Sequence, residues 1–174
     1  MDGPAPPNSR PGCVNAASGT AKLKVVRGAS PAKDSLAWRW KDAAAVSPGD
    51  LGDPLTQTGF ALCLYDTAGR RLAAAVPAGG TCLAKPCWEA SHGGFKYSNA
   101  ALTPDGLKTM SLKPGLAGKA RIVAKGRGQT LALPFLPLAV PVTVELVSAG
   151  TRCWSAHYTE ALTSTVQQFK ATSQ

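Results

Sequence analysis

The sequence predicts an all-β protein, with an antiparallel β-sandwich or jelly-roll-like fold of about nine or ten short strands. Short segments that alternate apolar and polar residues recur along the chain, and Gly or Pro turn signals separate them. Glycine (18 residues) and proline (14 residues) are spread through the 174-residue chain at isolated positions, where they favour turns between strands. No long helical segment intervenes, which favours sheets packed on each other.

Residues 1–20 predict a flexible N-terminal linker, and residues 21–174 predict a single β-sandwich domain. The first twenty residues are rich in Pro, Gly, Ser and Asn and contain almost no large apolar side chain. No secretory signal is visible at Met1, so the chain is interpreted as a mature or excised piece with an added start Met.

The expected strands follow one another along the chain. They are 21–27, 34–42, 59–66, 70–77, 88–97, 106–113, 140–147 and 152–159. In 59–66 both parities are apolar, which predicts a central strand covered on two sides. The tail 160–174 fits either a last strand or a short helix.

Residues 119–133 predict a β-hairpin with one apolar and one basic face, because a strand directs successive side chains to opposite sides. Ala120, Ile122 and Ala124 form the apolar parity, and Val123 interrupts the basic one. The basic residues are Lys119, Arg121, Lys125 and Arg127. Cations repeated every second residue, about 7 Å apart, form a ladder suited to a polymer with repeating negative charge.

The composition supports a globular, basic chain. Hydrophobic residues make up 44 % and charged residues 17 %, which argues against disorder. Lysine and arginine total 19 against 10 aspartate and glutamate, a formal net charge of +9. This charge attracts polyanions, although it is also compatible with mere solubility. No apolar stretch approaches the ~20 residues of a membrane helix, so no membrane insertion is expected.

Tryptophan offers a second candidate binding surface. The candidates are Trp38, Trp40, Trp88 and Trp154. Exposed rings on one strand face would form a platform for sugar rings. Leu36 shares a face with Trp38 and Trp40, which favours the alternative that these rings fill the core.

Five cysteines predict disulfides and therefore an oxidising compartment, which is extracellular, at the cell surface or periplasmic. Cys82 and Cys87 flank a short loop and are expected to pair. Cys63 and Cys153 are expected to form a disulfide across the core, and Cys13 then has no partner. The alternative is that Cys63 and Cys153 are free buried thiols. The spacing does not cluster as zinc ligands do, so no metal or cofactor is expected.

Several short segments resemble an uncharacterised module of predicted secreted or surface proteins of bacteria. They are Leu62-Cys63-Leu64-Tyr65-Asp66, Gly79-Gly80-Thr81-Cys82, Pro86-Cys87-Trp88, Gly94-Phe95-Lys96-Tyr97 and Gly118-Lys119-Ala120. The resemblance covers about residues 36–170. It implies an exported, cysteine-containing β-domain without an assigned activity, so it supplies no catalytic residues.

Three functions remain open. The favoured one is a non-catalytic structural or adhesive module of an exported protein, with other domains or subunits of a surface assembly as partners. The second is a ligand-binding module for carbohydrate or for an acidic polymer, through exposed Trp or a basic strand face; specific nucleic-acid recognition lacks a motif. The third is a hydrolase with a carboxylate pair, for instance Asp50 or Asp53 with Glu89, but no pattern of a catalytic nucleophile accompanies these residues.

Overall fold

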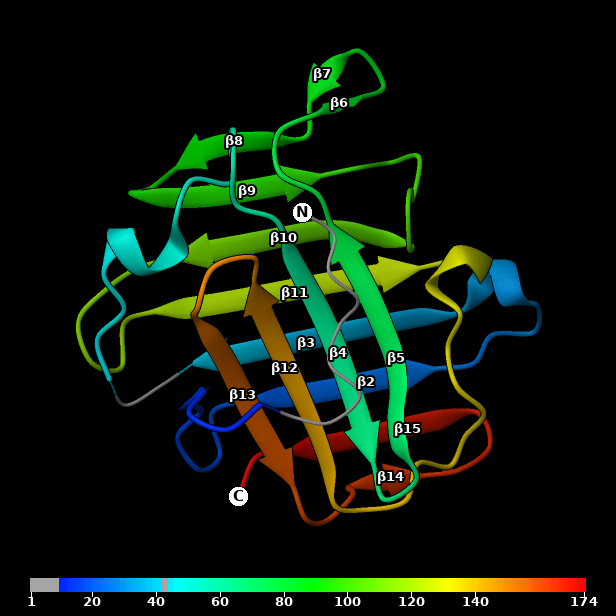
Figure 1. Ribbon diagram of the computed structural model, residues 1–174. Coiled ribbons are helices and arrows are strands. Elements are labelled where there is room, and N and C mark those ends of the chain that lie inside the picture. Colours follow the sequence, from blue (N-terminus) through cyan, green and yellow to red (C-terminus); the bar gives the residue numbers. More distant parts are fainter. Residues whose placement is uncertain (1–9, 42–43) are drawn as a thin grey trace.

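Two β-sheets packed face to face make up the fold (Figure 1). The computed structural model describes residues 10–41 and 44–174. Within these residues the helical segments are 3₁₀ turns at Pro31–Lys33, Pro48–Leu51 and Gln129–Leu131. The prediction of an all-β, antiparallel, sandwich-like fold is confirmed.

The larger sheet has eight strands, all antiparallel to their neighbours, in the order β14-β15-β2-β3-β11-β10-β9-β8. Their bounds are Thr163–Ser164 (β14), Gln168–Thr172 (β15), Lys22–Val26 (β2), Ser35–Lys41 (β3), Arg121–Arg127 (β11), Leu107–Lys113 (β10), Gly94–Ser98 (β9) and Trp88–Ser91 (β8). The C-terminal β15 pairs with β2 near the N-terminus, so the ambiguous tail is a strand.

The smaller sheet has five strands in the order β1-β13-β12-β4-β5. Their bounds are Val14–Asn15 (β1), Cys153–Tyr158 (β13), Val142–Ser148 (β12), Phe60–Asp66 (β4) and Gly69–Val76 (β5). β1 runs parallel to β13, and the other pairs are antiparallel. A hairpin of Thr81–Cys82 (β6) and Lys85–Pro86 (β7) stands apart from both sheets.

The strand count exceeds the prediction because β1, β6, β7 and β14 are two residues long. A two-residue strand has no alternation to detect. As predicted, β4 is an inner strand, between β12 and β5, and nearly all its residues are buried.

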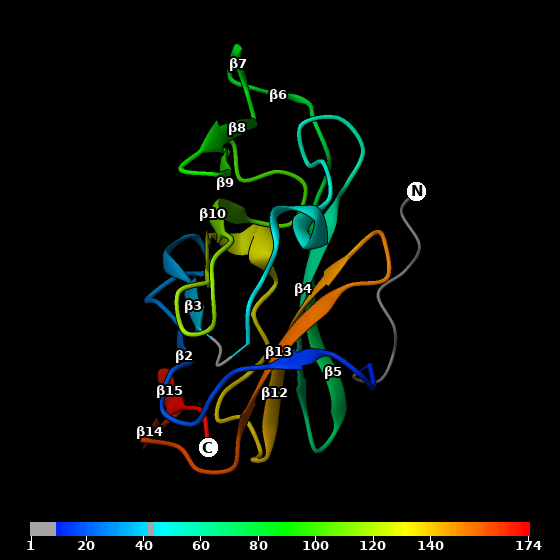
Figure 2. The same ribbon diagram turned by 90° about the vertical axis from the view of Figure 1, so that its left-hand side faces the viewer.

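The strands of the smaller sheet cross those of the larger sheet steeply in Figure 1, and Figure 2 shows the two layers edge-on. Two tryptophans of β3 connect them. The ring N–H of Trp38 donates to the Tyr158 hydroxyl (3.0 Å), and that of Trp40 donates to the Ser155 carbonyl (3.0 Å). Both rings are fully buried. They fill the core between the sheets with their polar atoms satisfied.

The predicted hairpin at 119–133 is wrong, because only its first half is a strand. β11 pairs with β10 on one side and β3 on the other. After it Gly128 adopts a φ of +87°, and Gln129–Leu131 forms a 3₁₀ turn. A following antiparallel strand would have no free edge of β11 to pair with, because both edges are occupied.

The predicted flexible linker does not describe residues 10–20. Residues 1–9 lie outside the described residues, but 10–20 are attached to the sheets. β1 pairs with β13. The backbone N–H of Arg10 donates to Oε1 of Glu145 (2.9 Å), and the Thr20 hydroxyl donates to the Lys41 carbonyl. A polar composition did not prevent these backbone contacts.

The cysteine pairing is partly as predicted. Cys82 and Cys87 form the expected disulfide, but Cys153 pairs with Cys13, and Cys63 is a buried free thiol. The predicted bridge between Cys63 and Cys153 is wrong because β12 lies between their strands. Cys13, by contrast, comes immediately before the strand that pairs with β13.

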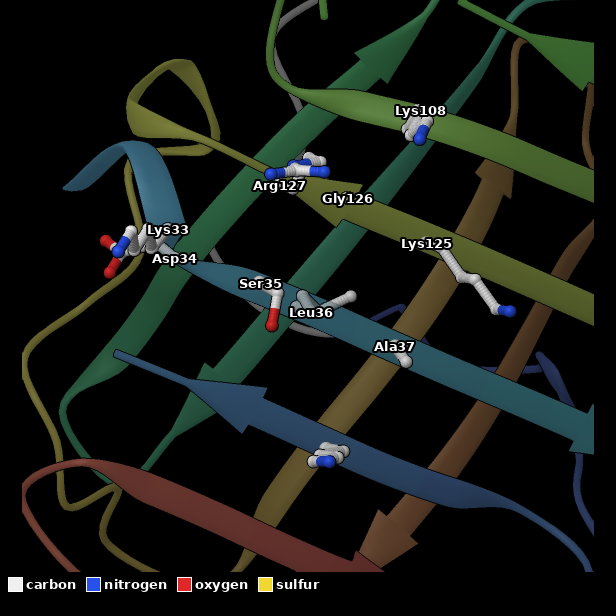
Figure 3. Close-up of a pocket in the computed structure, with 10 residues that line it drawn as sticks. Lys33, Asp34, Ser35, Leu36, Ala37, Lys108, Lys125, Gly126 and Arg127 are labelled. Carbon is white, nitrogen blue, oxygen red and sulfur yellow. The ribbon is translucent and has the colours of Figure 1, made fainter. Parts of the chain in front are cut away.

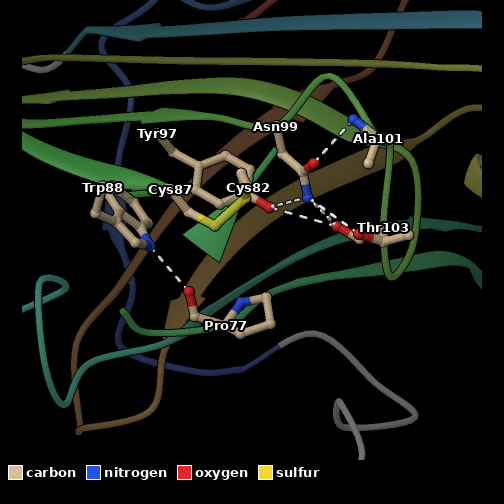
Figure 4. Close-up of a disulfide and its surroundings, with 8 residues drawn as sticks. All are labelled: Pro77, Cys82, Cys87, Trp88, Tyr97, Asn99, Ala101 and Thr103. Carbon is tan, nitrogen blue, oxygen red and sulfur yellow. Dashed lines mark hydrogen bonds between the residues drawn. A yellow bond between two sulfur atoms is a disulfide. The ribbon is translucent and has the colours of Figure 1, made fainter. Parts of the chain in front are cut away.

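Figure 4 shows how the Cys82–Cys87 disulfide sits against the corner of the larger sheet. Beside it, the Trp88 ring N–H donates to the Pro77 carbonyl (2.9 Å). Buried Asn99 donates to the Tyr97 hydroxyl (3.0 Å) and to the Thr103 carbonyl (2.6 Å). These bonds anchor the loops at this corner, so the disulfide belongs to a structural region.

Candidate anion-binding face

The larger sheet has one face in the core and one in solvent. Inward positions of its strands carry apolar side chains, and outward positions carry mostly lysine and arginine. We call the outward side the basic face. Its eleven cations are Lys22, Lys24, Arg39, Lys41, Lys96, Lys108, Lys113, Arg121, Lys125, Arg127 and Lys170. The strands place a single carboxylate on this side, Glu89, opposite Lys96 on β9.

Three carboxylates elsewhere in the described chain form ion pairs with arginines that are not part of the basic face. Three ion pairs occur: Arg27 with Asp34 (3.5 Å), Arg71 with Asp66 (2.6 Å), and Arg152 with Asp50 (2.8 Å). Across residues 10–41 and 44–174, no ion pair includes a cation of the basic face. The face is therefore predominantly positive.

Several cations of the basic face lie directly opposite each other on neighbouring strands. The pairs are Lys170 with Lys24, Lys22 with Arg39, Lys41 with Arg121, and Arg121 with Lys113. Side chains at such positions share one face with Cβ atoms about 5 Å apart, and like charges there are destabilising. This part of the face therefore weakens the fold instead of supporting it.

A shallow depression of about 430 Å³ lies on the same face, between β2, β3, β11 and β10 (Figure 3). Ser35 and Ala37 provide short side chains there, and the charged lining residues are five cations and Asp34, which is paired with Arg27. These cations are Lys24, Lys33, Lys108, Lys125 and Arg127. Here the register sets Lys125 opposite Ala37 and Arg127 opposite Ser35, so the depression avoids the directly opposed like charges.

The predicted basic ladder corresponds to part of this face. Arg121, Lys125 and Arg127 are exposed on β11, while Val123 between them is half-buried. Lys119 is exposed but precedes the strand. The predicted ladder lies on the solvent-facing side of β11, as expected, but it did not include the cations of the other strands. Those strands also alternate in the sequence, but the sequence does not show which strands are neighbours.

The predicted tryptophan platform is wrong for all four residues. Trp38, Trp40, Trp88 and Trp154 are between 0 % and 2 % exposed. Trp88 stacks near Phe60 and Tyr97, and Trp154 lies 6.5 Å from Phe60 between ring centroids. No described tryptophan ring is therefore available to stack on a sugar.

The carboxylates considered for hydrolysis have local structural contacts. Asp50 accepts from the Ser47 N–H (2.9 Å), which lowers the pKa of this carboxyl, and Arg152 acts in the same direction. A catalytic acid needs the opposite shift. Asp53 accepts from the Leu55 N–H (3.1 Å) and the Thr56 hydroxyl within its own turn. Glu89 is exposed on β8.

The outer side of the smaller sheet carries a different group of polar residues. Cys63 is fully buried, and burial raises the pKa of its thiol, with the Tyr65 hydrogen bond opposing. Glu145, 1 % exposed, lies opposite Cys63, and burial raises the pKa of its carboxyl. A thiol that is buried and held protonated is a poor nucleophile.

His157 belongs to the same side but interacts elsewhere. Its ring lies within hydrogen-bond distance of Thr143 (3.0 Å) and Asn15 (3.1 Å). Across the described residues, no group of three or more His, Cys, Asp or Glu side chains is arranged to hold a metal ion.

Among these same residues, no helix combines the length and apolar character needed to span a bilayer. Comparisons of the chain with protein-family models, with curated proteins and with solved structures find no match. No activity or ligand is therefore transferred from a relative, and the resemblance of residues 36–170 to a secreted module stays a prediction.

Proposed function

We propose that this chain is a non-catalytic, adhesive module of an exported protein, and that its basic face binds an anionic polysaccharide. One observation carries the proposal: the strands bring eleven cations and one carboxylate to a single solvent-facing side. A sheet gains nothing in stability from such a distribution, because directly opposed like charges repel.

The choice of a charged polymer follows from the side chains on offer. Neutral sugars are held mainly by stacking on aromatic rings, and the four tryptophans are buried. Single-stranded nucleic acid also relies on aromatic stacking. An anionic polysaccharide needs only the cations. The two disulfides support an oxidising location outside the cytoplasm, where such polymers occur.

The proposal is tested with heparin as the anionic probe and dextran as the neutral one. We expect heparin to bind and dextran not to bind. The heparin affinity should fall linearly with salt on logarithmic axes, by about 10³-fold between 50 and 200 mM if about seven cations are engaged.

Two matched double variants separate the basic face from overall charge. Arg39→Gln with Lys125→Gln removes two charges from the face and should lower heparin affinity by about tenfold or more. Arg10→Gln with Arg70→Gln removes two exposed charges on the side of the smaller sheet and should leave affinity within about twofold. Equal losses in both variants, or tighter binding to duplex DNA than to heparin, would contradict the proposal.

A further inference from the structure

The cations of the basic face are not evenly spread; seven of the eleven form one continuous path. Starting at β15, the path makes four steps to a neighbouring strand and two steps of two residues along a strand. We call it the basic track: Lys170, Lys24, Lys22, Arg39, Lys41, Arg121 and Lys113. It crosses five strands obliquely, from β15 through β2, β3 and β11 to β10.

Each step of the basic track brings two cations close together. Steps between strands join directly opposed residues, with Cβ atoms about 5 Å apart. Steps along a strand join residues i and i+2, about 7 Å apart. Four strand spacings and two steps along strands give the track a length on the order of 20–25 Å.

The other four cations of the basic face lie beside this path, and the track shares only Lys24 with the depression. Half-buried Val123, with Ser111 opposite it on β10, separates Lys125 from Arg121 along β11. Ala37 separates Lys125 from Lys24 across the strands. Lys125 and Arg127 thus have small neutral neighbours on β3, whereas Arg121 faces Lys41 and Lys113.

We infer that the anionic polymer lies along the basic track, oblique to the strands, and not along β11 or in the depression; this rests on the proposed function. The repulsion between directly opposed cations is largest where no counter-charge is bound. A polymer with regularly spaced negative groups relieves this repulsion at every step, so it gains more on the track than over isolated cations. The track therefore defines both the route and the minimum length of the ligand.

The experiment compares two double variants that each remove one lysine and one arginine. Lys22→Gln with Arg39→Gln interrupts the middle of the track, whereas Lys125→Gln with Arg127→Gln removes cations of the depression. We expect heparin affinity to fall about 30-fold for the first and no more than about threefold for the second, at equal ionic strength.

The thermal midpoint of each variant is measured in parallel. The track variant should be at least as stable as the original chain, since a repulsive pair has been removed, so its loss of affinity would not reflect unfolding. Heparin-derived oligosaccharides of increasing length should gain affinity until they span about 20–25 Å and change little beyond that.

The outcomes distinguish the inference from the proposed function. A larger loss in the Lys125 and Arg127 variant would overturn the track and assign the ligand to the depression. Equal losses would overturn the track while leaving a diffuse basic face as the binding surface. The absence of heparin binding in the original chain would overturn both.

Discussion

The outer sides of the two sheets differ in how they meet their surroundings. On the larger sheet, eleven cations face solvent, and several oppose each other directly. On the smaller sheet, Cys63, Glu145 and Ser155 are buried on the outer side, and residues 10–16 contact that side. The Cys13–Cys153 disulfide attaches this segment to β13.

This difference separates a surface that stabilises the fold from one that is available for a ligand. Polar groups on this side are bonded to the covering segment: the Asn15 side chain accepts from the hydroxyl of buried Ser155 and lies within hydrogen-bond distance of the exposed His157 ring. Cations that repel each other in solvent weaken the fold and retain their charge for a partner. Changes on the covered side should therefore affect stability, and changes on the basic face should affect binding.

The largest effect is expected from the covered side. Replacing Cys13 and Cys153 together by serine should lower the free energy of unfolding by about 3–5 kcal/mol, because their bond closes a long loop with a sequence separation of 140. Urea unfolding measures this loss. The control is Cys82→Ser with Cys87→Ser, whose separation is 5 and whose expected cost is about 2 kcal/mol. A smaller loss for the first pair than for the second would contradict the proposed attachment role.

A second effect concerns buried Glu145, whose Oε2 lacks a hydrogen-bond partner in the described structure. Glu145→Gln should raise the free energy of unfolding at pH 7 by about 1 kcal/mol. The substitution removes a buried charge, and the side-chain oxygen can still accept the hydrogen bond from the backbone N–H of Arg10.

The sign of the pH dependence follows from the raised pKa of Glu145. The folded state favours the protonated carboxyl, so above the folded pKa the ionised carboxylate lowers the free energy of unfolding of the original chain. This loss of stability disappears as the pH falls from the folded pKa towards the ordinary pKa of 4.5. The stability difference between the glutamine variant and the original chain should shrink over that interval. A difference that grows with falling pH would show that Glu145 is stabilised as a carboxylate.

The smallest effect is expected on the basic face. Arg121→Gln should stabilise the fold by about 0.5 kcal/mol at low salt, because Arg121 is opposed by both Lys41 and Lys113. Arg127→Gln is the matched control on the same strand; it faces Ser35 and should change stability by less than about 0.2 kcal/mol. The gain should vanish in 1 M salt, where the screening length is about 3 Å. Thermal unfolding at both salt concentrations provides the test, and a gain that persists in high salt would exclude charge repulsion as its cause.

Much of the fold was accessible from residue patterns. Alternation in Leu36, Trp38 and Trp40 placed these residues on one face, and they are buried together. The double apolar parity of 59–66 predicted the inner strand β4. By contrast, nothing local in Cys13 showed that it pairs with Cys153, since that depends on β1 lying beside β13.

The sequence by itself determined which side of each strand is apolar and which is basic, because side chains alternate with a period of two whatever the neighbouring strand is. It therefore determined most of the longer sheet-forming segments, the net positive charge and the basic parity of β11. Only the tertiary structure decided that Lys170, near the C-terminus, lies opposite Lys24, and that β3 lies beside β11. The physical reason is that strand order and register depend on pairing between distant segments, and this pairing turned scattered cations into one face with a continuous track.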